Sequence, residues 1–331
     1  MKALIPVAGI GSRLRPHTHT QPKSLIPVAG KPILAHIIDS LIAVGIDEFV
    51  FIIGYLGDKI EQYISINYPN IRSFFVVQTD GKGTGHALWL AQDILKDNEP
   101  VVIVFGDTII QADMKMIVSS EKSLLGVKRV NDPREFGVAE IDASGLITRL
   151  VEKPNIPKSN QALVGIYKIC ETKQLKQALK YNIENEIITR GEYQLTDALM
   201  RMIETGVKMY AHNVDAWFDC GKKDILLETN AILLKGTGYP RASSESYKST
   251  IIIDPVYIGQ DSRISNSIIG PNVSIGDNVI VDSSIIRNSI IGPYSHLENA
   301  NLDNSIIGND ASLKGISLSL NLGDSTEINF G

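Results

Sequence analysis

The chain has 331 residues, a net charge of −5, and hydrophobic and charged fractions of 44% and 21%. This composition is typical of a globular protein with two domains, or with one large domain and an appendage. The acidic balance argues against nucleic acid as a partner, and no apolar run approaches the about 20 residues that a membrane helix needs.

Two cysteines, Cys170 and Cys220, do not form a Cys-x-x-Cys spacing. We therefore expect two reduced thiols in a cytoplasmic protein. The apolar stretch Ala3–Ala8 is too short for the core of a signal peptide.

The first two thirds of the chain alternate strand-like and helix-like segments. In chain order we expect a strand at 2–8, a helix at 31–45, a strand at 48–54, a helix at 57–65, a strand at 73–78, a helix at 83–95 and a strand at 101–107. Short connections between such elements predict a doubly wound, mostly parallel α/β domain of the Rossmann-like kind.

The following segments contain more strands. We expect strands at 124–130, 137–142 and 162–169, and then helices at 194–206 and 222–236. Glycine, serine and other turn formers are enriched just after the last helix. The predicted organisation is therefore a first domain at 1–236, a linker at 237–250 and a second domain at 251–331.

The second domain has an aliphatic residue at every fifth or sixth position, separated by Gly, Asn, Asp and Ser. The series is Ile258, Ile264, Ile269, Ile275, Ile280, Ile286, Ile291, Leu297, Leu302, Ile307, Leu313 and Leu318. This period matches neither a helix nor an alternating strand, and it is typical of the hexapeptide repeats of a left-handed parallel β-helix. We expect the aliphatic side chains to fill a narrow core, with small polar residues at the corners.

The segment "VAGIGSRLRPHTHTQPK" places two glycines and several cations where the first strand ends. Gly9 and Gly11 alone fit an ordinary tight turn as well as a loop whose backbone N–H groups bind an anion. Arg13 and Lys23 favour the second interpretation, since a guanidinium fork and an ammonium suit a polyphosphate. The histidines nearby, His17 and His19, have no spacing typical of zinc ligands, and neither has His86.

The segments "AGIGSRLRP" and "QPKSLIPVAGKPIL" resemble the signature of the sugar-1-phosphate nucleotidylyltransferases. Ser12 replaces the usual Thr of that signature, and the loop is one residue shorter. The shorter loop is similar to that of bacterial UTP–glucose-1-phosphate uridylyltransferases. The general layout and the repeat are more similar to the long form of glucose-1-phosphate thymidylyltransferase.

Further segments match the family in order: "VVQTDGKGTGHAL", "VFGDT", "EFGVAEID", "VEKP", "LVGIYKI" and "WFDCG". The resemblance implies four groups of site residues. The nucleotide-binding residues would be Ala8, Gly9, Gly11, Ser12, Gln78, Gly83 and Thr84, and the sugar-binding residues would be Gly137, Glu152, Gly165 and Tyr167. The catalytic residues would be Arg13, Lys23 and Lys153. Asp107 and Asp219 would bind Mg²⁺.

The implied reaction joins a nucleoside triphosphate, dTTP or UTP, to a sugar-1-phosphate, with glucose-1-phosphate as the family default. Such transfers depend on positioning and charge neutralisation, and the anionic nucleophile needs no general base. A non-catalytic regulatory subunit of the same architecture stays an alternative. For the repeat, three roles stay open: assembly into a homo-oligomer, binding of a regulatory ligand, and acyl transfer. Acyl transfer would need a catalytic histidine, and His296 is the only histidine of the repeat.

Overall fold

The computed structural model describes residues 1–236 and 247–315. The chain divides into two compact units. The first contains Met1–Pro27 and Lys31–Leu226, and the second contains Val28–Gly30 and the described residues from Leu227 onward. Residues 237–246 of the expected linker lie outside the described part, so the linker stays a prediction.

Four parallel strands form one half of the sheet in the first unit, in the order β6-β1-β4-β5. Their bounds are Lys2–Val7 for β1, Glu48–Ile53 for β4, Arg72–Val77 for β5 and Val101–Val104 for β6. Leu4 of β1 lies between Val50 and Ile103 of its neighbours, and all three are fully buried. Near-continuous aliphatic runs predicted these strands because a central parallel strand is covered on both faces.

The other half of the sheet is largely antiparallel and continues from β6 through β11, β9 and β10. Off this path β8 pairs with β11, and β12 pairs with β8 in parallel. The bounds are Ser123–Arg129 for β8, Gly137–Ile141 for β9, Ile147–Glu152 for β10, Gln161–Ile169 for β11 and Met209–Asn213 for β12. Two short antiparallel strands, β7 (Thr108–Gln111) and β13 (Ala216–Asp219), pair beside the sheet, and β2 (Pro27–Val28) pairs with β3 (Lys31–Pro32). The expected Rossmann-like fold is confirmed, with a mixed sheet.

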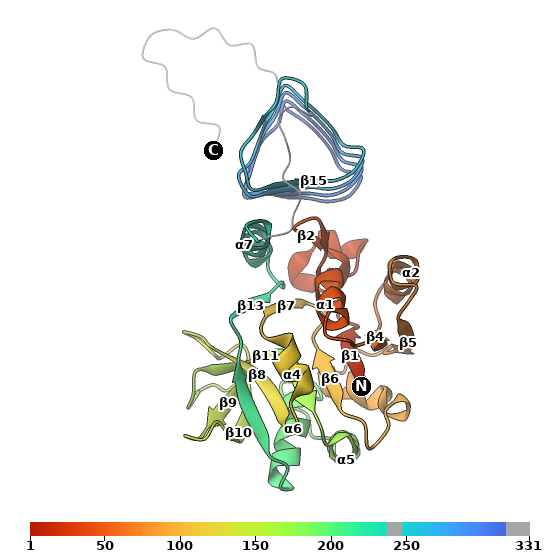
Figure 1. The fold of residues 1–331 in the computed structure, drawn as a ribbon, viewed down its shortest axis with the longest axis vertical. Helices are drawn as coiled ribbons and strands as arrows, with labels where there is room; N and C mark the ends of the chain where they lie inside the picture. The colour runs from red at the N-terminus through yellow and green to blue at the C-terminus, as the bar shows by residue number, and fades with distance from the viewer. Residues whose placement is uncertain (237–246, 316–331) are drawn as a thin grey trace. The chain divides into compact units, whose positions relative to one another are not determined.

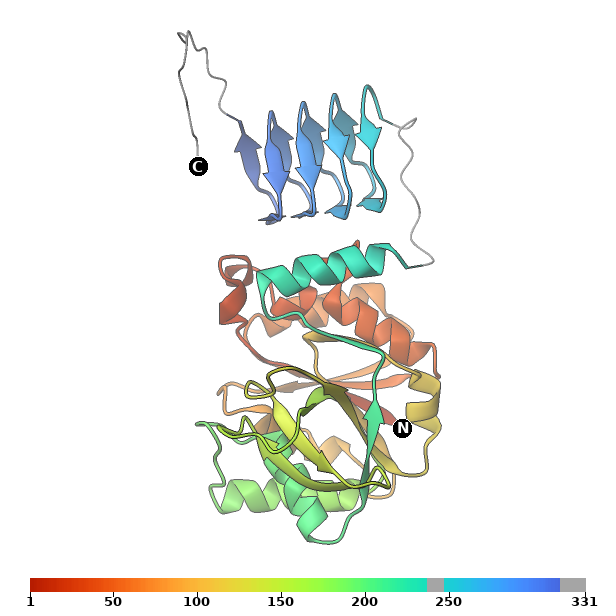
Figure 2. The same cartoon turned by 90° about the vertical axis from the view of Figure 1, so that its left-hand side faces the viewer.

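Helices lie on both sides of this sheet (Figures 1 and 2). They are α1 (Ile33–Ile42), α2 (Gly57–Asn67), α3 (Thr84–Leu90), α4 (Met114–Ser119), α5 (Thr172–Glu184) and α6 (Leu195–Glu204). A further helix, α7 (Lys223–Leu234), begins in the first unit and continues in the second. Four short 3₁₀ turns lie at Ser12–Leu14, His17–His19, Lys23–Leu25 and Gln92–Ile94. None of the helices in the described part of the chain has the length and apolar character needed to cross a bilayer.

The second unit contains a left-handed parallel β-helix whose coils are triangular when seen end on (Figure 1) and stack strand upon strand (Figure 2). Each side is a four-stranded parallel sheet. The first side holds β14 (Ile251–Ile252), β17 (Ile268–Ile269), β20 (Ile285–Arg287) and β23 (Asn301–Asp303). The second holds β15 (Val256–Ile258), β18 (Val273–Ile275), β21 (Ile290–Ile291) and β24 (Ile306–Ile307), and the third holds β16 (Arg263–Ser265), β19 (Ile280–Asp282), β22 (His296–Glu298) and β25 (Ser312–Lys314).

The corners of the coils explain the many small polar residues of the repeat. Asn272 and Asn288 both have a left-handed backbone, with φ of 60° and 44°. Asparagine tolerates this conformation better than other side chains. The Asn272 amide also donates to Oδ1 of Asn288 one coil further on, at 2.9 Å, so each corner residue links its coil to the next.

One residue of the expected core series was assigned wrongly. Ile280 is 41% exposed, whereas its neighbour Val281 is fully buried and stacks between Ile264 and Leu297. Successive residues of a strand point to opposite faces, and both Ile280 and Val281 suit a strand, so the residue types alone did not distinguish them. Leu318, the last of the series, lies outside the described residues.

Candidate active site

A pocket of about 490 Å³ opens in the first unit beside the carboxyl ends of β1 and β6. Ligands bind at this edge of open α/β sheets. Every site residue expected from the sequence lines this one pocket: Ala8, Gly9, Gly11, Ser12, Arg13, Lys23, Gln78, Gly83, Thr84, Asp107, Gly137, Glu152, Lys153, Gly165, Tyr167 and Asp219. The fold therefore brings together residues that lie as far apart in the sequence as Ala8 and Asp219.

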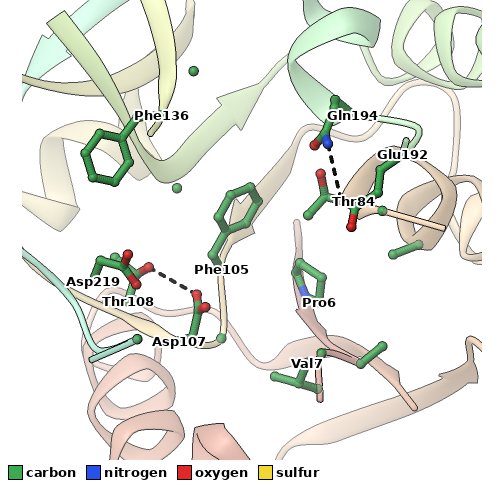
Figure 3. Close-up of a pocket in the computed structure, with 18 of the residues that line it drawn as sticks. Pro6, Val7, Thr84, Phe105, Asp107, Thr108, Phe136, Glu192, Gln194 and Asp219 are labelled. Atoms are coloured by element: carbon green, nitrogen blue, oxygen red, sulfur yellow. Dashed lines mark hydrogen bonds between the residues drawn. The ribbon is translucent and has the colours of Figure 1, made fainter. Parts of the chain in front are cut away.

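Lys23 lies between the two aspartates that were expected to bind a metal ion. Its Nζ is 2.7 Å from Oδ2 of Asp107 and 3.7 Å from Oδ1 of Asp219. The Lys23 side chain is only 10% exposed, and those of Asp107 and Asp219 are 40% and 23% exposed. Figure 3 shows both carboxylates on the same side of the pocket. One partly buried ammonium thus neutralises a pair of carboxylates that would otherwise repel each other.

The protonation of Asp107 depends on this arrangement. Burial raises the pKa of Asp107, but the charge of Lys23 and its hydrogen bond to the carboxylate outweigh that effect and hold the pKa below its usual value. A hydrogen bond of 3.3 Å from the hydroxyl of Thr108 acts in the same direction. Asp107 is therefore ionised and ready to bind a cation at neutral pH.

Arg13 extends the cationic edge of the pocket. It lies in the 3₁₀ turn Ser12–Leu14, which follows the left-handed Gly11. The Thr18 hydroxyl donates to the carbonyl of Gly11 at 2.9 Å and so ties the loop back on itself. Nη2 of Arg13 is 3.9 Å from Oδ2 of Asp219, and its side chain is more than half exposed. The guanidinium is consequently free to reach a second anionic group in the pocket.

The end of the pocket beside α3 is formed by a tightly packed loop. Gly83 has φ of 95°, and a Cβ there would lie 2.6 Å from the carbonyl oxygen of Tyr193. The position therefore requires glycine for both its backbone conformation and its space. The Thr84 hydroxyl accepts a hydrogen bond of 3.2 Å from the backbone N–H of Leu195, and Gln78 is buried nearby.

Glu152 and Lys153 lie at the end of β10. The Glu152 side chain is only 9% exposed and accepts a hydrogen bond of 2.6 Å from the hydroxyl of Thr196. Burial raises the pKa of Glu152, and the Thr196 hydrogen bond and the Lys153 charge offset only part of this rise. Gly137 is the cross-strand neighbour of Glu152, and a Cβ at Gly137 would lie 3.0 Å from both Glu152 Oε2 and Thr196 Oγ1.

Tyr167 is buried and packs edge-to-face against Phe105, with ring centroids 5.7 Å apart. Burial, followed by the Glu152 charge, raises the pKa of the Tyr167 phenol, so the hydroxyl stays protonated and can donate. The backbone N–H of Phe105, just after β6, donates to the Gly165 carbonyl of β11 at 2.9 Å and so links the end of β6 to β11.

Several residues that line the pocket escaped the sequence analysis. They include Ser24, Phe105, Thr108, Phe136, Glu192, Gln194, Thr196 and Trp217. Glu192 and Gln194 are joined by a 3.2 Å hydrogen bond at the end opposite to Asp107 (Figure 3). Ser24, Phe105, Thr108, Phe136 and Trp217 lie within the motifs quoted above, beside the residues that were singled out. For Glu192, Gln194 and Thr196 the signal was the polar run "GEYQLTD" at the start of an amphipathic helix, which is also the ordinary composition of a helix start.

The set of polar groups determines what the pocket can bind. Three cations, Arg13, Lys23 and Lys153, face a cavity large enough for more than one small ligand. Within residues 1–236 and 247–315 no cluster of three or more His, Cys, Asp or Glu side chains forms a metal site. Two carboxylates, at Asp107 and Asp219, suit Mg²⁺, which completes its coordination with water and substrate phosphate oxygens.

The fold and this pocket together define an α/β enzyme that handles phosphate-bearing ligands. The family model described as nucleotidyl transferase matches residues 2–236. The chain therefore belongs to the nucleotidyl transferase family, and the resemblance found in its motifs is confirmed.

Individual relatives agree with this assignment. The glucose-1-phosphate thymidylyltransferase of Streptomyces antibioticus is 30% identical over 325 residues, which cover 96% of this chain and 89% of the relative. The low-salt glycan biosynthesis nucleotidyltransferase Agl11 of Haloferax volcanii is 33% identical over 260 residues, or 76% and 71% of the two chains. A solved structure from Bacillus anthracis, assigned as a glucose-1-phosphate thymidylyltransferase and complexed with sucrose, superposes with a TM-score of 0.62 at 29% identity. The match covers 73% of this chain and 98% of that one.

Proposed function

We propose that the chain transfers a nucleotidyl group from dTTP or UTP to a sugar-1-phosphate, most simply glucose-1-phosphate. A phosphate oxygen of the sugar-1-phosphate attacks the α-phosphorus of the triphosphate. The bond between the α-phosphorus and the bridging oxygen of the β-phosphate breaks, so that pyrophosphate leaves and a nucleotide sugar forms. Because the nucleophile is already an anion, the reaction needs no residue to remove a proton.

The observation that carries the proposal is the convergence of all the motif residues on one pocket. The main barrier in such a reaction is the approach of two anions, so catalysis depends on positioning and on neutralising charge. Cations at Arg13, Lys23 and Lys153 line the same cavity. Arg13 would hold the β- and γ-phosphates, Lys23 would contact the α-phosphate, and Lys153 would hold the incoming sugar phosphate.

Asp107 and Asp219 would hold Mg²⁺, which when bound supplies further neutralisation of the triphosphate charge. The Lys23 ammonium lies beside both carboxylates, 2.7 Å from Asp107 and 3.7 Å from Asp219. We propose that the same ammonium contacts the α-phosphate of the bound triphosphate.

The remaining residues would select the two substrates. Gln78, Gly83 and Thr84 would bind the base, and the loop of Ala8, Gly9, Gly11 and Ser12 would bind the triphosphate. Glu152 would accept hydrogen bonds from sugar hydroxyls, with Gly137, Gly165 and Tyr167 shaping the sugar end. The similarity to the glucose-1-phosphate thymidylyltransferase of Streptomyces antibioticus supports dTTP and glucose-1-phosphate as the first pair to test.

For the β-helix we propose assembly into a homo-oligomer. The exposed side chains of Ile280 and Ile285, at 41% and 38%, leave apolar surface on its outer sides. Acyl transfer is disfavoured because His296 is the only histidine in 251–331. Analytical ultracentrifugation of the whole chain would measure its oligomeric state, and a monomer at all concentrations would contradict assembly. We also propose a cytoplasmic location, because neither Cys170 nor Cys220 forms a disulfide bond, as is usual for proteins of that compartment.

The deciding experiment for the activity is a pyrophosphate-release panel with Mg²⁺ present. It crosses dTTP, UTP, CTP and GTP with several sugar-1-phosphates. We expect release with a pyrimidine triphosphate and glucose-1-phosphate. Release with UTP alone would favour a uridylyltransferase, and no release in any combination would favour a non-catalytic regulatory subunit.

A further inference from the structure

The side chain of Gln78 is buried between two fixed neighbours. It is only 6% exposed. Its Nε2 donates to the carbonyl oxygen of Gly83 at 3.1 Å and lies 3.0 Å from Nδ1 of His86. Because Gln78 also lines the pocket, the way in which its amide is held decides which atom it offers to a ligand.

Elementary hydrogen-bond chemistry determines the orientation of this amide. A backbone carbonyl can only accept, so the Gln78 amide must present its nitrogen to Gly83. The second hydrogen on that nitrogen then points to His86, whose Nδ1 must be the acceptor. His86 is therefore a neutral imidazole with its proton on Nε2. Both amide hydrogens of Gln78 are used, and Oε1 is the atom left available as an acceptor.

The His86 ring is held in place by aromatic neighbours. It lies beside Trp89 and stacks with Tyr193, with centroid distances of 5.7 and 6.3 Å. Tyr193 is itself tied to the loop, since its N–H donates to the Lys82 carbonyl at 2.9 Å and its carbonyl accepts from Gly85 at 2.8 Å. The contacts with Trp89 and Tyr193 thus hold the His86 ring, and with it the acceptor nitrogen Nδ1, in place.

The charges around His86 favour its neutral form. Burial lowers the pKa of the imidazole, the Lys82 ammonium lowers it further, and the Asp80 carboxylate offsets part of the change. Lys82 and Asp80 form an ion pair of 3.1 Å on the same loop. From the facing segment come the Tyr193 phenol and, one residue before it, the Glu192 carboxylate, which also lines the pocket.

We propose that His86 is a positioning residue that presents Oε1 of Gln78 to the nucleobase and so selects bases that carry an N–H donor. Uracil and thymine have a hydrogen on N3, which can donate to Oε1. Cytosine has a bare acceptor at N3, which would face Oε1 without a hydrogen between them. The inference rests on the proposed function of the pocket. It also explains why this pair separates UTP and dTTP from CTP but does not distinguish UTP from dTTP.

Protonation of His86 would oppose this selection. A hydrogen on Nδ1 would face the amide hydrogen that Gln78 directs to His86. Turning the amide oxygen toward His86 would set that oxygen against the Gly83 carbonyl, which can only accept, so no orientation of the amide would satisfy both neighbours. Oε1 would then no longer be held toward the base. We therefore expect the preference for UTP over CTP to weaken as the pH falls toward about 5, below the ordinary His pKa of about 6.5.

The test compares the wild-type protein with His86→Leu and His86→Asn. Leucine fills part of the space of the imidazole but removes the acceptor, whereas asparagine places an acceptor oxygen near the position of Nδ1 and does not titrate. For each protein kcat/KM with UTP and with CTP is measured by pyrophosphate release from pH 5 to 8.5. Kd values from calorimetry replace kcat/KM where turnover with CTP is too slow.

We expect the ratio of UTP to CTP to fall about 10-fold in His86→Leu, because the Gly83 carbonyl still holds the amide in part. In His86→Asn the ratio should stay within about 3-fold of the wild-type value at pH 8 and lose its pH dependence. An unchanged ratio in His86→Leu, or a ratio in His86→Asn that keeps the wild-type pH profile, would overturn the inference. Absence of pyrophosphate release from the wild type with any substrate pair would instead contradict the proposed function.

Discussion

Replacing Lys23 is the most direct test of the charge interactions in the pocket. Replacing it by methionine keeps the length of the side chain and removes the charge. At the observed 2.7 Å from Asp107, the Coulomb attraction is about 6 kcal/mol at an effective dielectric constant of about 20 and about 1.5 kcal/mol in bulk water. Because the Asp107 side chain is 40% exposed, screening by water reduces the expected loss of stability to about 2 kcal/mol.

The loss should depend on pH with a defined sign. Lys23 holds the folded pKa of Asp107 below its usual value, against the effect of burial. Its stabilising contribution is therefore complete well above the unfolded pKa of about 3.9 and disappears as the pH falls through the folded value. We expect Lys23→Met to melt about 4–8 °C lower than the wild type at pH 7.5. The difference should shrink toward pH 3.

Activity and controls complete the test. Turnover should fall about 10²–10³-fold, as for the loss of one preorganised charge contact in an active site. Lys96→Met is the matched control, because Lys96 also lies 2.7 Å from a carboxylate, that of Glu99, but is 71% exposed. We expect it to change stability by less than about 0.5 kcal/mol and to keep full activity. In Lys23→Met/Asp107→Asn part of the lost stability should return.

Two outcomes would refute the reasoning about Lys23. One is a stability loss in Lys23→Met that is the same at pH 3 and pH 7.5, since a packing defect does not titrate. The other is turnover close to that of the wild type, which would remove Lys23 from the phosphate site.

Three further predictions concern other parts of the pocket. Arg13→Ala should lower turnover about 10²–10³-fold in the pyrophosphate assay, and near-normal turnover would disprove its phosphate contact. Gly137→Ala should raise KM for the sugar-1-phosphate about 10-fold with little change in KM for the triphosphate, because the new Cβ would crowd Glu152 and Thr196 at 3.0 Å; equal effects on both KM values would contradict this. Glu152→Gln should be more stable than the wild type by a margin that grows as the pH rises from 4 to 8. Burial raises the folded pKa of Glu152, so its ionisation destabilises the fold as the pH passes that value; parallel melting curves would exclude this effect.

Much of the fold could be predicted because burial leaves a local pattern in the residues. The aliphatic runs of β1 and β4, the helical spacing of α1 and the five-to-six-residue period of the β-helix each record which side chains face a core. The glycines and cations of the loop that holds Arg13 likewise indicated an anion site from neighbouring residues alone.

Other features depend on contacts between distant segments. Thr196 reaches Glu152 across 44 positions, and Lys23 reaches Asp107 across 84. The hydrogen bond between Gln78 and His86 links residues only eight positions apart, yet it depends on the way Tyr193 closes the loop. Such contacts are products of packing, and no periodicity of the chain records them.

By itself, therefore, the sequence determined the class of fold and the presence of a β-helix, because these follow from short-range pattern. Its resemblance to a family indicated which residues to expect in the pocket. Only the tertiary structure decided that Val281 and not Ile280 fills the core, and that one lysine neutralises both aspartates. Only it decided that the amide nitrogen of Gln78 contacts both Gly83 and His86. Each of these depends on which groups the folded chain brings within a few ångströms of one another, and at that distance the strength and direction of hydrogen bonds and charges are set.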